Sequence, residues 1–128
     1  MSESESAEQQ RRALDLQDDT VHAHILELST VNEYAAAQLA GRARMKRAHY
    51  QSLLRHALRH ANAHSIDWWL AALVPRLGVR SVLSLLRREV ELAPAGVEKA
   101  LYFLPRYVTA SEEHTASLAA LRAAVPSR

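Results

Sequence analysis

Four histidines lie at helical spacing in the middle of the chain, and histidine pairs of this kind can bind a metal. They are His49, His56, His60 and His64, separated by seven, four and four residues. Two histidines four residues apart on a helix can bind zinc together, with a third ligand from a neighbouring helix. The segment contains no His-Glu-x-x-His arrangement and no nearby acid. We therefore assign no metal, and we expect the three candidate ligands to be neutral histidines beside a buried stripe: His56, His60 and His64.

The same segment is basic, because residues 34–66 contain six basic residues and no acid. Several bases on one helix can contact the phosphates of a nucleic acid. The basic face has no aromatic residues for base stacking and matches no recognition motif. Nucleic-acid binding by a helix over 42–64 is therefore the alternative function, and its candidate residues are Arg42, Arg44, Lys46, Arg47, Arg55 and Arg59.

The charges are segregated along the chain although the net charge is only +2. Residues 1–33 carry eight acids and two arginines, whereas residues 34–66 carry a charge of +6. We expect these two segments to lie against each other as antiparallel helices, each partly neutralising the other.

Residue types that most catalytic and cofactor sites need are missing. The chain has no cysteine, which excludes disulfides, thiolate nucleophiles and iron–sulfur sites. It has no glycine-rich phosphate loop, no nucleophile elbow and no suitably spaced pair of carboxylates. We therefore expect a protein that is not an enzyme and that uses no cofactor and no small-molecule substrate.

Composition indicates a single all-α domain. Of 128 residues, 23 are alanine and 19 are leucine, against three glycines and four prolines, a balance that favours helices. The longest wholly apolar run has seven residues, whereas a membrane-spanning helix needs about 20. The acidic start does not resemble a signal or transit peptide. We expect a cytoplasmic protein with no membrane partner.

Apolar spacing predicts a helical bundle with a disordered acidic tail over 1–6 and one domain over 7–125. Residues 7–64 form one or two long helices with a bend near 41–45, and shorter helices follow at 66–74, 79–92, 95–104 and 111–124. In the first long helix, apolar residues at coiled-coil spacing flank Asn32. A polar residue at such a position can fix helix register or partner number. Because fewer than three heptads are present, the spacing favours an amphipathic helix within an intramolecular bundle, with a coiled coil as the alternative.

Two stretches of the second half resemble each other. Ile66, Leu70 and Leu73 align with Val97, Leu101 and Leu104, and each copy continues with Pro-Arg. A helical hairpin of about thirty residues is the usual unit of helix-pair solenoids. In this respect residues 66–125 resemble two HEAT-type hairpins, and the resemblance implies an extended surface for binding partners.

Adjacent Trp68 and Trp69 cannot both face one core, because neighbouring residues on a helix point about 100° apart. Phe103 likewise lies off the apolar stripe of its helix. Aromatic residues of this kind are enriched at binding hot spots. We therefore expect a protein–protein interaction module, a small adaptor or assembly subunit, that binds another protein or a second copy of itself through Asn32, Trp68, Trp69, Tyr102, Phe103 and Tyr107.

Overall fold

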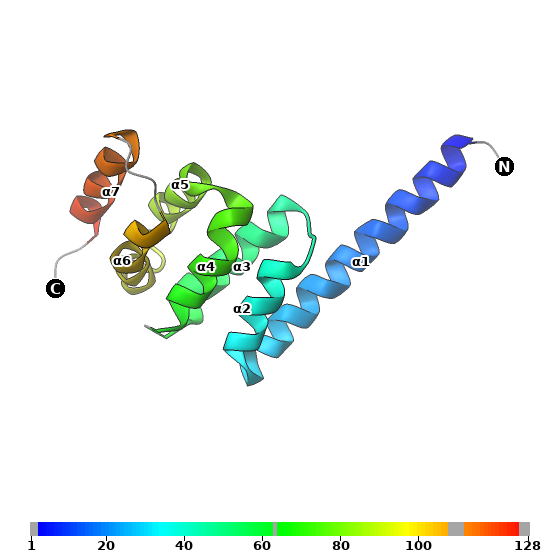
Figure 1. The fold of residues 1–128 in the computed structure, drawn as a ribbon, viewed down its shortest axis with the longest axis horizontal. Helices are drawn as coiled ribbons and strands as arrows, with labels where there is room; N and C mark the ends of the chain where they lie inside the picture. The colour runs from blue at the N-terminus through cyan, green and yellow to red at the C-terminus, as the bar shows by residue number, and fades with distance from the viewer. Residues whose placement is uncertain (1–2, 63, 108–111, 126–128) are drawn as a thin grey trace.

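The fold is all-α, as the composition predicts. The computed structural model describes residues 3–62, 64–107 and 112–125, and every regular element in these ranges is helical. Figure 1 shows an elongated arrangement in which the helices follow one another from the amino-terminal rod to α7. The helices are α1 (Glu3–Val31), α2 (Glu33–Arg42), α3 (Arg47–His60), α4 (Ser65–Leu77), α5 (Val79–Glu89), α6 (Pro94–Phe103), the 3-10 helix η1 (Leu104–Tyr107) and α7 (Glu112–Ala124).

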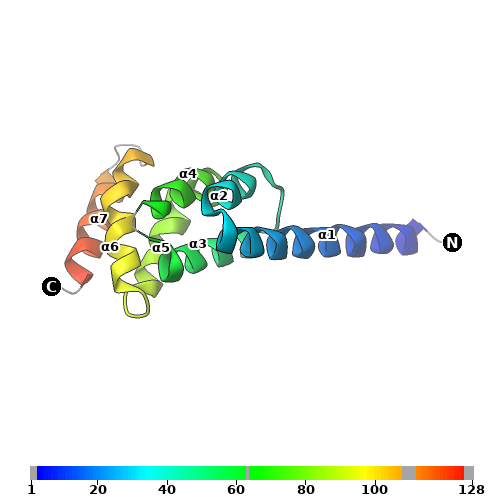
Figure 2. The same ribbon diagram turned by 90° about the horizontal axis from the view of Figure 1, so that it is seen from below.

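The helices pack in two layers, and each helix contacts its next-but-one neighbour along the chain. One layer contains α2, α4 and α6, and the other contains α1, α3, α5 and α7. Figure 2 shows α2 and α4 lying over the layer that contains α1 and α3. The two hairpins expected over residues 66–125 correspond to α4–α5 and α6–α7. Their assignment as HEAT-type repeats stays a prediction.

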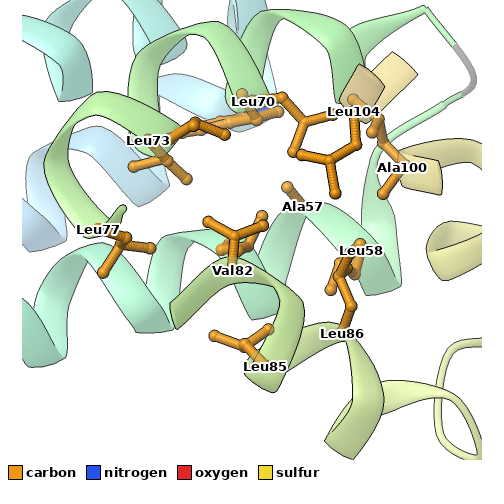
Figure 3. Packing of buried hydrophobic residues seen from close by; sticks show 14 of the residues in the cluster. Ala57, Leu58, Leu70, Leu73, Leu77, Val82, Leu85, Leu86, Ala100 and Leu104 are labelled. Atoms are coloured by element: carbon orange, nitrogen blue, oxygen red, sulfur yellow. The ribbon is translucent and has the colours of Figure 1, made fainter. Parts of the chain in front are cut away.

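Helix α4 lies at the centre of the packing. It contacts α2, α3, α5, α6 and η1, which agrees with its largely apolar sequence, because a helix that is apolar on most sides must be buried on most sides. Its core residues Leu70, Leu73 and Leu77 face leucine and valine side chains of α3 and α5 (Figure 3). The buried residues of α4 are Ser65, Ile66, Trp69, Leu70, Leu73, Val74 and Leu77.

Asn32 does not lie inside a continuous helix, so the coiled-coil interpretation of this spacing is wrong. It separates α1 from α2 and is the N-cap of α2, where its side-chain Oδ1 accepts a hydrogen bond from the Ala35 amide at 3.1 Å. Asparagine is a favoured N-cap because its oxygen satisfies an otherwise unpaired amide of the first turn. Its role in the folded chain is therefore local.

Other helix boundaries agree with the sequence in part. The break expected near 41–45 lies between Arg42 and Arg47, where α2 ends and α3 begins. Residues 3–6, which were expected to be disordered, are the first residues of α1, while residues 1–2 of the expected tail lie outside the described residues. The segment 7–64 thus contains three helices instead of one or two.

Helix α1 has two unlike halves. Its carboxy-terminal half packs against α2 and α3, whereas its amino-terminal half extends away from all the other helices (Figures 1 and 2). An isolated helical segment of about 12–15 residues is only marginally stable in water. The extended half therefore gains little stability from the rest of the folded chain.

Gly96 provides a test of how closely α6 approaches α3. A Cβ atom at Gly96 would lie 1.8 Å from the backbone oxygen of Leu58, whereas one at Gly41 would lie 3.4 Å from Ala72. We expect Gly96→Ala to lower the free energy of unfolding by about 3 kcal/mol, since overpacking against backbone cannot relax easily. Gly41→Ala should change it by less than about 1 kcal/mol, because helix propensity favours alanine. Urea unfolding followed by circular dichroism measures both, and equal effects would contradict the close approach.

Candidate functional site

A groove between α2 and α4, here called the aromatic groove, is the first candidate site. It has a volume of about 450 Å³. Two of its lining residues are aromatic and four are alanine or glycine, so its surface is mainly apolar. The lining residues are Tyr34, Ala37, Gln38, Gly41, Arg42, Trp68, Ala71 and Ala72.

Small residues bring the two helices of the aromatic groove close together. Ala36, Ala37 and Ala40 of α2 are buried, and the backbone of Gly41 lies against Ala72 of α4. Side chains this small allow close approach, so the floor of the groove is shallow and smooth. The guanidinium of Arg76 fixes one end, since its Nε and Nη2 donate to the Gly41 carbonyl at 3.2 and 2.7 Å.

Tyr34 and Trp68 form an exposed aromatic pair in this groove. Their ring centroids are 5.1 Å apart with an interplanar angle of 76°, an edge-to-face contact that is a favoured geometry for aromatic rings. Trp68 is 37% exposed and Tyr34 is 49% exposed. Trp68 is thus exposed at the surface, and its role in binding a partner stays a prediction. Tyr34 was missed, because no pattern in the sequence places α2 beside α4.

Trp69 is a core residue, and the expectation that it anchors a partner needs correction. Its side chain is fully buried, and its indole Nε1 donates to the Glu33 carboxylate at 3.0 Å. A tryptophan N–H usually finds such a partner when it is buried. Of the two adjacent indoles, only Trp68 is therefore available at the surface of the folded chain.

The remaining predicted anchors lie on α6 and η1. Tyr102 is 77% exposed and makes an edge contact with the half-buried Phe103 at 5.0 Å. The Arg106 guanidinium lies 5.5 Å from the centre of the Phe103 ring, within cation–π range. Tyr102 is the exposed member of this group.

Tyr107 links η1 to α4. Its hydroxyl donates to Asp67 Oδ1 at 2.6 Å. Burial raises the pKa of Tyr107 to about 12, and the hydrogen bond to Asp67 and the charge of that carboxylate act in the same direction. The contact holds η1 against the first turn of α4, so the Tyr107 hydroxyl is engaged within the chain.

A second groove, here called the arginine groove, lies between α3 and α5 and has a volume of about 260 Å³. Arg47 and Arg55 belong to the basic set expected from the sequence. Arg80 and Arg88 of α5 were not in that set, although both point away from the apolar stripe of their helix in the sequence pattern. The lining residues are Arg47, Gln51, Arg55, Arg80, Ser81, Ser84, Leu85 and Arg88.

The six predicted bases do not form one stripe. Arg42 lines the aromatic groove, and Arg44 and Lys46 lie between α2 and α3. Arg59 donates from Nε and Nη2 to the buried Glu89 carboxylate, both at 3.1 Å. Because Arg47 and Arg55 line the arginine groove, the bases expected on one helix over 42–64 are divided among four environments.

The acidic and basic segments meet at only a few described contacts. Asp18 Oδ2 accepts a hydrogen bond from the Lys46 backbone amide at 2.9 Å, and Asp19 accepts one from His49 at 2.8 Å. Arg55 and Arg59 face Glu89 of α5 instead of α1. Among the side chains that the structure describes, these contacts between acids of α1 and the basic segment lie at the start of α3.

The histidines do not form a metal site within the part of the chain that the structure describes, because no group of three or more potential ligands comes together there. His56 and His60 tilt against each other with ring centroids 4.7 Å apart. His64 is exposed and lies outside α3.

His22 of α1, which the sequence did not single out, stacks on His49 of α3. Their ring centroids are 4.4 Å apart, and the His22 ring also contacts the Ser52 hydroxyl at 3.2 Å. Burial lowers the pKa of His22 and the charge of His49 lowers it further, while Asp19 opposes them. Burial likewise lowers the pKa of His56, with His60 acting in the same direction and Glu33 against it.

Compared with known protein families, with curated proteins and with solved structures, the chain matches none of them. The described helices are also too short or too polar for any of them to cross a membrane. The candidate sites therefore rest on the geometry above.

The lowered pKa values predict that stability falls in mild acid. Above the ordinary histidine pKa of 6.5, His22 and His56 are neutral in both the folded and the unfolded chain. As the pH falls through that value, the unfolded chain binds protons that the folded chain does not, so the free energy of unfolding decreases. Thermal melts should give a lower Tm at pH 5.5 than at pH 8.

Replacing His22 by Asn and His56 by Gln together should flatten this pH dependence. His64→Gln is the matched control, since it removes an exposed histidine and should leave the slope as it is in the parent protein. A Tm that is the same at pH 8 and pH 5.5 in the parent protein would refute the assignment.

Proposed function

We propose that this chain is a non-catalytic protein–protein interaction module, an adaptor or a subunit of a larger assembly, and that the aromatic groove is its contact surface. The observation that carries the proposal is the exposed pair of Tyr34 and Trp68 over a floor of small residues. Tryptophan and tyrosine are the residue types most enriched at binding hot spots.

The uncovered residues of α4 form one stripe. Trp68, Ala71, Pro75 and Arg76 are exposed and Ala72 is half-buried, at the three- and four-residue spacings of a single helix face. All other faces of α4 are covered by neighbouring elements. One more helix packed on this exposed stripe would bury the remaining face of α4.

The occupant we propose is an amphipathic helix of another protein with an aliphatic face and an acidic residue at one end. Helix-in-groove recognition needs a shallow apolar channel between two helices, and the small residues of the floor supply one. Arg42 is the only charged residue among those that line the groove. Arg76 is close to this end of the groove, because it donates to the carbonyl of the neighbouring Gly41. A carboxylate on the partner would complement this end.

The extended half of α1 also supports an assembly role. Its backbone stands clear of the other helices (Figure 1), and a helix gains most of its stability from packing. A partner that covers this half as well as the groove would stabilise both.

The alternative function, nucleic-acid binding through residues 42–64, is supported by only part of its predicted set. Arg47 and Arg55 line the arginine groove, whereas Arg42 lines the aromatic groove and Arg59 binds Glu89. A single helix over 42–64 therefore does not present all six bases to one nucleic acid, and we favour the protein-binding function over this form of the alternative.

Selection of helical peptides displayed on phage against the immobilised protein tests the proposal. We expect enriched peptides with aliphatic residues at i, i+3, i+4 and i+7 and an acidic residue at one end. The double variant Tyr34→Ala with Trp68→Ala should weaken their binding at least about tenfold, since loss of a hot spot costs about 2 kcal/mol or more. The matched control Tyr102→Ala removes an exposed tyrosine of α6 and should bind as the parent does.

Three outcomes would overturn the proposal: no enriched peptide, peptides that bind the double variant as well as the parent, or equal losses in the Tyr102→Ala control. Light scattering adds a check on the occupant. A dimer of the parent protein that dissociates in the double variant would assign the groove to a second copy of the chain and contradict the proposed partner.

A further inference from the structure

Helices α3 and α5 run parallel, so that their amino-terminal ends lie together at one end of the arginine groove. Arg47, the first residue of α3, donates from Nη2 to the Leu77 carbonyl at 3.0 Å and to the Ser81 hydroxyl in the first turn of α5. At the other end, Arg59 near the end of α3 binds Glu89 at the end of α5. These two contacts fix the direction of both helices.

The shared amino-terminal end concentrates positive charge. Helix amino-termini carry a partial positive charge and normally attract acids, yet neither α3 nor α5 has an acid in its first turn. Arg47 and Arg80 lie there instead. Asp18 of α1 accepts a hydrogen bond from the Lys46 amide and compensates part of the charge at the start of α3.

No acidic residue lines the arginine groove, which four arginines do line. The described ion pairs of Arg55 and Arg59 are with Glu89, whose buried carboxylate is bound by Arg59 and lies 3.7 Å from Arg55 Nε. Arg47 and Arg88 contact serine hydroxyls. Because a guanidinium has five N–H donors, these contacts orient the side chains and leave donors for an anion.

We propose that the arginine groove binds the phosphate backbone of a nucleic acid strand. Arg47 and Arg55 are eight residues apart on α3, as are Arg80 and Arg88 on α5, and eight residues of helix extend about 12 Å. Phosphates along one strand of a duplex recur about every 3.4 Å of its axis, so this length spans about three intervals and therefore about four phosphates. A single inorganic phosphate would engage only one end of such a site.

The groove offers contacts to phosphates and few to bases. Ser81, Ser84 and Gln51 add neutral hydrogen-bonding groups beside the arginines, and the lining contains no aromatic ring. Base stacking on aromatic rings is the usual source of base contacts in single-strand binding, whereas phosphate contacts position a strand without reading its sequence. Binding through this groove is therefore independent of sequence. It goes beyond the protein-binding function and uses the other layer of helices.

Fluorescence anisotropy with labelled oligonucleotides of mixed sequence, single-stranded and duplex, tests this inference across a series of salt concentrations. For four phosphate contacts on a single strand, the slope of log K against log salt should be about −2.8. The double variant Arg80→Ala with Arg88→Ala should reduce this slope to about −1.4 and weaken binding about tenfold at 100 mM salt.

The matched control is Arg44→Ala with Arg122→Ala, which removes the same charge from exposed positions outside both grooves. It should retain at least half of the parent affinity. Equal weakening by both double variants would reduce the effect to net charge and overturn the inference. So would absence of oligonucleotide binding at 50 mM salt, or binding of pyrophosphate without binding of oligonucleotides.

Discussion

The packing of α4 against four helices and η1 is the constraint on which the rest of the structure depends. Its apolar sequence requires cover on most sides, and small residues make that cover possible, because Gly41 lets α2 lie against Ala72. The side chain of Trp69 is buried on the inner face of α4, where its indole N–H donates to the Glu33 carboxylate. What these neighbours leave open is one stripe around Trp68, so the candidate protein-binding surface is a consequence of how the core is built.

The two layers separate two kinds of surface chemistry. The layer with α2 and α4 presents the aromatic groove, and the layer with α3 and α5 presents the arginine groove. Glu89 links the two helices of the second layer, because its buried carboxylate pairs with Arg55 and Arg59 of α3. Loss of these partners would leave a buried charge uncompensated. That pairing also fixes the parallel direction of α3 and α5, which brings arginines of both helices into one groove.

Local features of this structure were predictable from the sequence, and features set by tertiary packing were not. Alanine and leucine content predicts the all-α fold. The spacing around Asn32 fits a coiled-coil seam as well as two capped helices, and only the turn of the backbone distinguishes them. The adjacent tryptophans indicate that one of the two must face away from the core. Only the tertiary structure shows that Trp69 is the buried one, with its indole N–H donating to Glu33. Arg80 and Arg88 are not in the predicted basic set, because the sequence does not show that α5 packs beside α3 in parallel orientation.

Acrylamide quenching of single-tryptophan variants tests most directly whether α4 is enclosed except along the Trp68 stripe. In Trp69→Phe the partly exposed Trp68 is the one remaining indole, and in Trp68→Phe the buried Trp69 is, so tryptophan fluorescence reports one side chain at a time. The account predicts strong quenching in the first variant and weak quenching in the second, with helical circular dichroism retained in both. Equal quenching of the two indoles, or stronger quenching of Trp69, would contradict it.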